Sequence, residues 1–225
     1  MPPISGVVLV TGTGTGVGKT IVTAAVAAAA AAAGKRVAVL KPGQTGGDSD
    51  ETTIRQLAAP AHAATLVSYP DPLAPAAAAR VSGLPPLDLD DVINALDESF
   101  DLTLVEGAGG LLVPMGPGWT MADFAEKTGA PAIVVARAGL GTLSDTALTL
   151  EALQRRGIAG YVVIGAWPAE PELVHYTNLD DMPGQLHGVL PEGAGGLEPG
   201  VFRRSAPGWL TPALYGTSDD PREDV

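Results

Sequence analysis

A glycine-rich segment between two apolar runs constrains this chain more than any other feature. Residues 11–20 read TGTGTGVGKT, directly after the apolar residues 7–11 and before the alanine-rich residues 24–33. A continuous apolar run is typical of a strand buried on both faces, and alanine has the highest helix propensity. The segment is therefore predicted to join a strand to a helix over residues 19–33.

The composition of this joining loop predicts a phosphate site. Glycines let successive backbone N–H groups turn toward an anion, and the helix N-terminus adds its positive dipole end. Lys19 would reach the β- and γ-phosphates of a nucleotide, and the Thr20 hydroxyl would bind Mg²⁺. The expected nucleotide contacts in the loop are Thr13, Gly14, Thr15, Gly16, Val17, Gly18, Lys19 and Thr20.

The loop departs from the strict pattern G-x-x-x-x-G-K-[ST], because position 13 is Thr13 instead of glycine. The alternative is a glycine-rich turn that binds no nucleotide. A related form, K-G-G-x-G-K-T, has lysine where this chain has Gly14. ATPases that pair with themselves through that lysine are therefore disfavoured.

Apolar runs and helical patterns alternate along the rest of the chain. Strands are expected at residues 7–11, 36–40, 66–69, 102–106, 132–136, 161–165 and 185–190, and helices at 19–33, 51–58, 75–81, 87–99, 120–127 and 143–156. This alternation predicts an α/β fold with a doubly wound, mostly parallel sheet, organised as one P-loop NTPase-like domain over residues 1–225. Residues after about 194 are rich in glycine and proline, so we expect a loosely packed tail, anchored by residues 209–214.

Charge and cysteine content limit the partners of the chain. It has 13 Lys and Arg against 25 Asp and Glu, a net charge of -12, and no cysteine. Such an acidic chain repels nucleic acids and anionic membranes. The absence of cysteine excludes disulfides and fits a reducing cytosol. Residues 1–5 lack the basic start of a signal peptide, and residues 24–33 are too few for a bilayer span of about 20 residues. We therefore expect a cytoplasmic location.

Carboxylates for a metal come from two other loops. Mg²⁺ bound through Thr20 and phosphates usually needs one or two carboxylates. Glu106 ends an apolar strand, where ligands bind to parallel sheets, although it could also be a solvated or capping residue. Asp48 and Asp50 follow the second strand, and the sequence does not decide between them as ligands. Asp50 could also cap the next helix.

Three further polar residues point to the same crevice. Lys41 ends the second strand and could stabilise both a transferring phosphoryl group and a substrate anion; the alternative is a solvated lysine at the rim. Thr15 and Thr45 could donate hydrogen bonds there or stabilise turns.

Four motifs together resemble the dethiobiotin synthetase family. TGTGTGVGKT is followed by KPGQTG at residues 41–46, VEGAGG at 105–110 and AGLGTL at 138–143, and the resemblance covers about residues 7–194. Cobyrinic and cobyric acid synthases share parts of it. They carry an additional glutaminase domain, for which this chain is too short and has no nucleophilic cysteine.

The resemblance implies a reaction in biotin biosynthesis. CO₂ adds to one amine of 7,8-diaminononanoate, ATP phosphorylates the resulting carbamate, and the neighbouring amine closes the ureido ring with release of phosphate. Such chemistry requires positioning and charge stabilisation. The alternatives are a regulatory P-loop ATPase of the same superfamily that acts through partner binding, and a relative without enzymatic activity.

The resemblance also implies roles for individual residues. Lys19 and Lys41 would be catalytic, and Thr20, Asp50 and Glu106 would bind Mg²⁺. Members are homodimers in which residues 138–143 of one subunit receive the carboxylate of the substrate bound to the other. The implied substrate contacts are Thr15, Lys41, Thr45, Pro72, Glu106, Gly109, Val113, Leu140, Gly141, Thr142 and Leu143, and the further nucleotide contacts are Glu106, Gly165, Pro191, Gly193 and Ala194.

Two departures from the family bear on recognition. Ser144 and Asp145 stand where the family usually has Asn-His, and Asp145 would repel the substrate carboxylate unless it points away as a cap. Residues 165–168 read GAWP, without the asparagine that many members use to bind adenine. We therefore expect the base to be held by backbone groups alone, including those near residues 191–194, and CTP or GTP to be accepted beside ATP.

Overall fold

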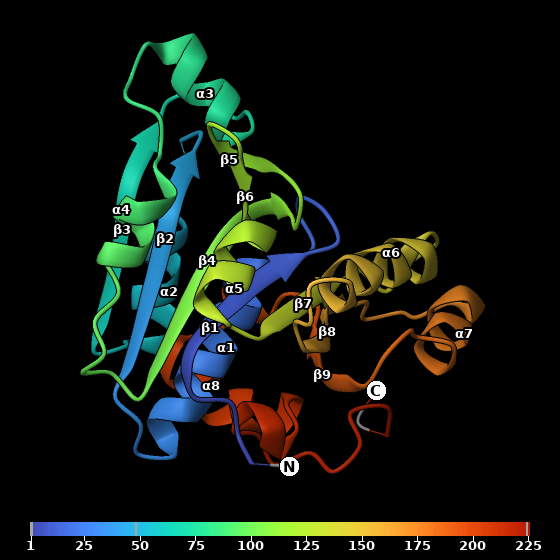
Figure 1. The fold of residues 1–225 in the computed structure, drawn as a ribbon. Helices are drawn as coiled ribbons and strands as arrows, with labels where there is room; N and C mark the ends of the chain where they lie inside the picture. Colours follow the sequence, from blue (N-terminus) through green and yellow to red (C-terminus); the bar gives the residue numbers. More distant parts are fainter. Residues whose placement is uncertain (1, 48, 224) are drawn as a thin grey trace.

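A parallel sheet forms the centre of the molecule (Figure 1). The computed structural model describes residues 2–47, 49–223 and 225, and within them the sheet has seven strands in the order β3-β2-β4-β1-β7-β8-β9, with every neighbouring pair parallel. The strands are β1 (Gly6–Gly12), β2 (Val37–Thr45), β3 (His62–Tyr69), β4 (Leu102–Gly110), β7 (Ala132–Ala136), β8 (Gly160–Trp167) and β9 (Leu186–Pro191). A two-stranded antiparallel hairpin, β5 (Pro114–Gly116) and β6 (Trp119–Thr120), follows β4.

Helices cover both faces of the sheet, as predicted. Along β1, Val8 and Val10 belong to the core on one face, and Leu9 belongs to the core on the other. The first face packs against α1 (Lys19–Ala32), α2 (Asp50–Ala58) and α8 (Pro199–Ser205). The second packs against α4 (Leu89–Asn94), α5 (Met121–Thr128) and α6 (Thr142–Gln154). The remaining helices are α3 (Pro75–Ser82), at the top of Figure 1, and α7 (Leu173–Asp180). None of the helices described is long and apolar enough to cross a membrane.

The second strand is longer than the sequence suggested. We expected a loop from residue 42, but β2 continues through Pro42, and Lys41 and Gly43 pair with Thr65 and Val67 of β3. Pairing of β2 with its other neighbour, β4, ends at Leu40. Proline is tolerated in a strand where its missing N–H faces no partner, which explains why the strand does not stop there.

The predicted helix over residues 87–99 is also wrong in length. The helix is confined to α4, Leu89–Asn94, and is capped by Asp88, whose side chain accepts a hydrogen bond from the N–H of Asp90. By contrast, the helix expected over residues 120–127 is present as α5, which Thr120 caps by forming a capping box with Asp123.

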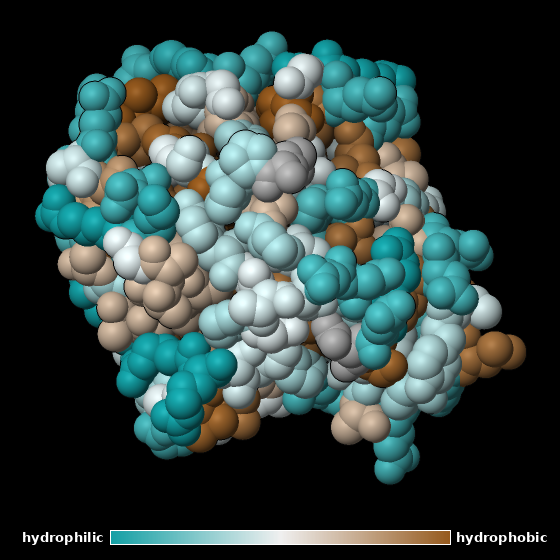
Figure 2. Space-filling view, turned by 90° about the horizontal axis from the view of Figure 1, so that it is seen from below, coloured by the Kyte–Doolittle hydropathy of each residue, from teal (hydrophilic) through white to brown (hydrophobic). Residues whose placement is uncertain are grey.

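The C-terminal segment is not loosely packed, contrary to expectation. Phe202, Leu210 and Leu214 are fully buried in the core beneath α1. The N–H of Thr211 donates to His187 O of β9 at 2.9 Å. Seen from the end where this segment and the N-terminus lie, the surface is mainly hydrophilic and neutral, with separate hydrophobic groups (Figure 2). A few widely spaced apolar residues of this segment thus complete the core. The burial of Leu210 and Leu214 confirms that residues 209–214 anchor the segment.

This packing predicts a large effect of one substitution. Phe202→Ala should lower the free energy of unfolding by about 3–5 kcal/mol, because it leaves a cavity in the core. Val201→Ala, at a half-exposed neighbouring position of the same helix, should stay within about 1 kcal/mol of the unaltered chain. Urea denaturation measures both, and equal losses in the two variants would contradict the burial of the tail.

Candidate nucleotide and substrate site

Three neighbouring strands end at one cavity. β1, β2 and β4 are adjacent in the sheet, so their carboxyl ends bring the phosphate loop, residues 41–46 and residues 106–110 together. The cavity has a volume of about 450 Å³. Its lining includes Thr15, Gly16, Gly18, Lys19, Thr20, Lys41, Thr45, Asp50, Glu106 and Gly109, all predicted from the sequence.

The phosphate loop presents a free helix N-terminus and a cation to this cavity. α1 begins at Lys19 after Gly18, and no side chain caps its first turn. The Nζ atom of Lys19 donates to Gly14 O at 3.0 Å, so the side chain folds back along the loop. Burial, together with the positive charge of Lys41, lowers the pKa of Lys19 to about 8. Thr13 stands where the strict phosphate-loop pattern has glycine. Its N–H donates to Val135 O of β7 at 2.9 Å, which links the loop to the sheet.

Two carboxylates, a hydroxyl and an ammonium meet beside the loop. Thr20 Oγ1 lies 3.0 Å from both Asp50 Oδ1 and Glu106 Oε1. Lys41 Nζ lies 2.5 Å from Asp50 Oδ2 and 2.9 Å from Glu106 Oε1. Lys41 and Glu106 are buried, whereas Asp50 is only partly so. Sequence reasoning placed all four residues in one crevice, and the structure confirms that they come together.

The charges in this cluster support one another. Burial alone would disfavour the charged form of Lys41, but the negative charges of Glu106 and Asp50 outweigh it and raise the pKa of Lys41. Burial likewise opposes ionisation of Asp50, but the charge of Lys41 and the hydrogen bond from Thr20 hold the pKa of Asp50 below its usual value. Lys41 and Asp50 are therefore both held in their charged forms.

Asp50 is free to face the cavity because another residue caps its helix. The Ser49 side chain accepts from the N–H of Thr52 at 3.2 Å, so the alternative that Asp50 caps the helix is wrong. Asp48, the other candidate ligand, lies outside the described residues.

The donor set fits a hard divalent cation. Among the residues described, no group of three or more His, Cys, Asp or Glu side chains gathers anywhere. A cation here would therefore have two carboxylates and the Thr20 hydroxyl from the protein. Mg²⁺ prefers oxygen donors and is commonly held by one or two carboxylates together with phosphates of a substrate.

Thr23 is a site residue that sequence reasoning missed. Its hydroxyl is fully buried, 2.7 Å from Glu106 Oε2 and 2.9 Å from Lys19 O. Thr20 and Thr23 are three residues apart, so they share a face of α1. This spacing, at the start of a run of alanines, is the signal that could have found it.

A second cavity of about 310 Å³ adjoins the first. Both cavities are lined by Thr15, Thr45 and Gly109, and the second extends to Pro72 and Val113. These predicted substrate contacts are thus brought together. Leu140, Gly141, Thr142 and Leu143 line neither cavity; they form the start of α6, where Leu140 is 85% exposed.

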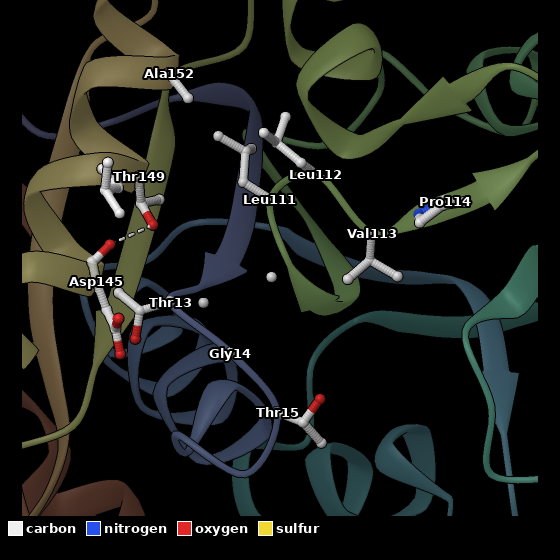
Figure 3. A pocket seen from close by; sticks show the side chains of 13 residues that line it. Thr13, Gly14, Thr15, Leu111, Leu112, Val113, Pro114, Asp145, Thr149 and Ala152 are labelled. Carbon is white, nitrogen blue, oxygen red and sulfur yellow. Dashed lines mark hydrogen bonds between the residues drawn. The ribbon is translucent and has the colours of Figure 1, made fainter. Parts of the chain in front are cut away.

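Asp145 faces a third cavity, of about 520 Å³, between the phosphate loop and α6 (Figure 3). Figure 3 shows Asp145 and Thr13 on one side of it, across from Leu111 and Val113. The Asp145 carboxylate does not cap α6; it lies 3.9 Å from Arg137 Nη2. Arg137 therefore offsets part of the negative charge that the sequence placed near the substrate carboxylate.

The predicted base contacts are backbone groups close to the phosphate loop. A Cβ atom on Gly18 would lie 2.8 Å from Gly165 O, and one on Gly165 would overlap the Val17 carbonyl oxygen. Residues 193–196 follow β9 and lie against Ile21 of α1. Trp167, which ends β8, is buried edge-on against Tyr176 with ring centroids 5.7 Å apart. Trp167 is therefore a core residue.

Comparison with known proteins gives consistent matches. A family model described as an AAA domain matches residues 7–202. The chain is 52% identical to the ATP-dependent dethiobiotin synthetase BioD of Streptomyces avermitilis over 229 residues, which cover 95% of each chain. It is 52% identical to that of Saccharopolyspora erythraea over 194 residues, 80% of this chain and 86% of the other. It is 49% identical to that of Streptomyces coelicolor over 226 residues, 95% of each.

The fold is similar to that of a solved P-loop NTPase. The septum site-determining protein MinD of Pyrococcus horikoshii, complexed with Mg-ADP, matches with a TM-score of 0.60 and 18% identity over 90% of this chain and 95% of that one. At this level of identity the match establishes the fold alone.

The contact of Thr23 with Glu106 generates a prediction. Thr23→Val removes the hydroxyl donor from a buried carboxylate at nearly constant volume, and should cost about 2–3 kcal/mol of unfolding free energy. Thr23→Ser keeps the hydroxyl and loses one methyl group, for about 1 kcal/mol. Chemical denaturation distinguishes them; a serine variant as unstable as the valine variant would show that the hydrogen bond contributes nothing.

Proposed function

Because the chain belongs to the ATP-dependent dethiobiotin synthetase family, we propose that it converts 7,8-diaminononanoate, CO₂ and ATP to dethiobiotin, ADP and phosphate in biotin biosynthesis. It is thus an ATP-dependent ligase that forms carbon–nitrogen bonds. One observation supports this most strongly: a cavity holding a phosphate loop, two lysines and two carboxylates opens into a second cavity suited to a small substrate. The regulatory ATPase alternative gains no support, since position 14 is glycine.

The phosphate end of the reaction belongs to the loop and Lys19. Its backbone N–H groups and the start of α1 would hold the nucleotide phosphates, and Lys19 would leave Gly14 O to contact the transferring phosphoryl group. Mg²⁺, when bound by Thr20, Asp50 and Glu106, would supply positive charge against the β- and γ-phosphate oxygens. No side chain of the protein needs to form a covalent bond.

The carbamate end belongs to Lys41 and two threonines. Lys41 lines the first cavity beside Asp50 and Glu106, where its ammonium could stabilise the negative charge of the carbamate. Thr15 and Thr45 line both cavities and would donate hydroxyl hydrogen bonds to the carbamate or the diamine. Pro72, Gly109 and Val113 would exclude water around the carbon chain.

The substrate carboxylate is assigned to a second copy of the chain. In the proposed homodimer, residues 138–143 receive the carboxylate of the substrate held by the partner subunit. The start of α6 has no side-chain cap, so no capping side chain occupies the N–H groups of its first turn, and Leu140 beside it is largely exposed. The repulsion expected from Asp145 is reduced by Arg137. We further propose that residues 1–225 act as a single domain and that the protein is cytoplasmic, as its lack of cysteine suggests.

Nucleotide choice is proposed to be loose. The base would meet backbone groups of Gly165, Pro191, Gly193 and Ala194, which offer little to distinguish one base from another.

A phosphate-release assay tests this function. Protein with Mg-ATP, bicarbonate and diaminononanoate should release phosphate, and omission of the diamine should abolish release, since the carbamate is the phosphoryl acceptor. Phosphate release that ignores the diamine would instead favour the regulatory ATPase, and no release at all would indicate a relative without activity. In the same assay CTP and GTP should support turnover; strong preference for ATP over every other triphosphate would refute the loose base site.

Substitution of Lys41 tests its role in the carbamate half of the reaction. Lys41→Ala should lower turnover by about 10²-fold or more, because it removes a charge placed against the developing anion, while nucleotide binding stays largely intact. Lys35→Ala, an exposed lysine beyond α1, serves as the control with unchanged turnover. Unaltered turnover in Lys41→Ala would remove Lys41 from the mechanism.

A further inference from the structure

The ammonium of Lys41 contacts both carboxylates of the proposed metal site. Its Nζ atom contacts Asp50 Oδ2 at 2.5 Å and Glu106 Oε1 at 2.9 Å, so one cation of the chain bridges both carboxylates of the proposed metal site. Lys41 is only 4% exposed, so water contributes little to this neutralisation. In the chain alone, the carboxylate pair already has a counter-ion.

This arrangement competes with metal coordination at Glu106 Oε1. Mg²⁺ binds oxygen atoms at about 2.0–2.1 Å and demands near-octahedral geometry. Glu106 Oε1 is shared, because it accepts from Lys41 and also lies 3.0 Å from Thr20 Oγ1. At Asp50, Thr20 contacts Oδ1 and Lys41 contacts Oδ2. A divalent cation bound to Glu106 Oε1 would stand next to the Lys41 ammonium, and like charges at short range repel.

We propose that Lys41 and Mg²⁺ compete for the carboxylates of Asp50 and Glu106, and that the Lys41 ammonium moves from these carboxylates toward the adjoining substrate cavity when the metal binds. Lys41 then neutralises the two carboxylates before the metal binds and acts as a catalytic residue afterwards. The exchange itself rests on the contacts of Lys41, Asp50 and Glu106. Only the purpose of the displaced ammonium, which is to meet the carbamate, rests on the proposed function.

The neighbourhood of Lys41 gives the ammonium somewhere to go. Its Nζ atom also donates to Gly107 O at 3.2 Å, a contact that does not involve either carboxylate. Gly107 precedes Ala108 and Gly109, which line both cavities. The main chain of Lys41 is fixed by pairing with Thr65 of β3, so rotation of the side chain alone can accomplish the exchange.

The other lysine of the cavity provides a matched control. Lys19 Nζ donates to a backbone carbonyl, Gly14 O, and makes no ion pair with Asp50 or Glu106. Removal of Lys19 therefore deletes a cation from the same cavity, while Asp50 and Glu106 keep their ion pairs with Lys41.

The test uses MgCl₂ alone, without nucleotide or diamine, and compares the unaltered chain with Lys41→Met and Lys19→Met. In EDTA, Lys41→Met should melt about 6 °C or more below the unaltered chain, because two carboxylates lose their counter-ion. Millimolar Mg²⁺ should restore most of that loss in Lys41→Met, and should raise the melting temperatures of the unaltered chain and of Lys19→Met much less. Equal Mg²⁺ responses in all three proteins would overturn the proposal.

A second measurement uses the unaltered chain and so does not depend on whether a variant folds. In the unaltered chain labelled with ¹⁵N and ¹³C at lysine, the side-chain signals of Lys41 should shift as Mg²⁺ is added and those of Lys19 should move less. A Lys41 signal that stays fixed while the metal binds would overturn the exchange. Since neither measurement includes the diamine, a failed phosphate-release assay would refute the proposed function and leave the exchange standing, and the reverse also holds.

Discussion

A carboxylate with no exposed surface, that of Glu106, is the constraint on which the rest of the site depends. Burying a charge is costly unless it is paired and hydrogen-bonded, and Glu106 meets that condition with Lys41 from β2 and with Thr20 and Thr23 from α1. These partners come from separate segments of the chain. They can meet only if β1, β2 and β4 are neighbours and α1 lies close against the sheet.

The alanine run of α1 makes that close approach achievable. Residues 27–30 are alanines with at most 3% of their surface exposed, and their short side chains keep the helix axis near the strands. The same helix carries Thr20 and Thr23 within hydrogen-bonding distance of Glu106. A composition that resembles low complexity is therefore a geometric requirement of the site.

The sequence was sufficient to predict what depends on local pattern. Apolar strands ending in Lys41 and Glu106, and a glycine loop ending in Lys19, predicted both the parallel sheet and the convergence of these residues. What failed depends on tertiary partners. Pro42 is compatible with a strand because β4 no longer pairs beside it, and Ser49 takes the cap that Asp50 was equally able to fill. The burial of Phe202 could not be predicted, because a single aromatic residue in a glycine- and proline-rich segment gives no periodic pattern. Its role depends on packing against distant segments of the chain.

The contact between Gly18 and Gly165 limits how this protein can change over evolutionary time. Each glycine occupies the space that a side chain on the other's segment would need, so neither position can gain even a methyl group unless the backbone of its neighbour moves. A new side chain in this part of the molecule must therefore arise at positions other than these two glycines. The close contact that holds the phosphate loop against β8 thus requires glycine at two positions that are far apart in the sequence.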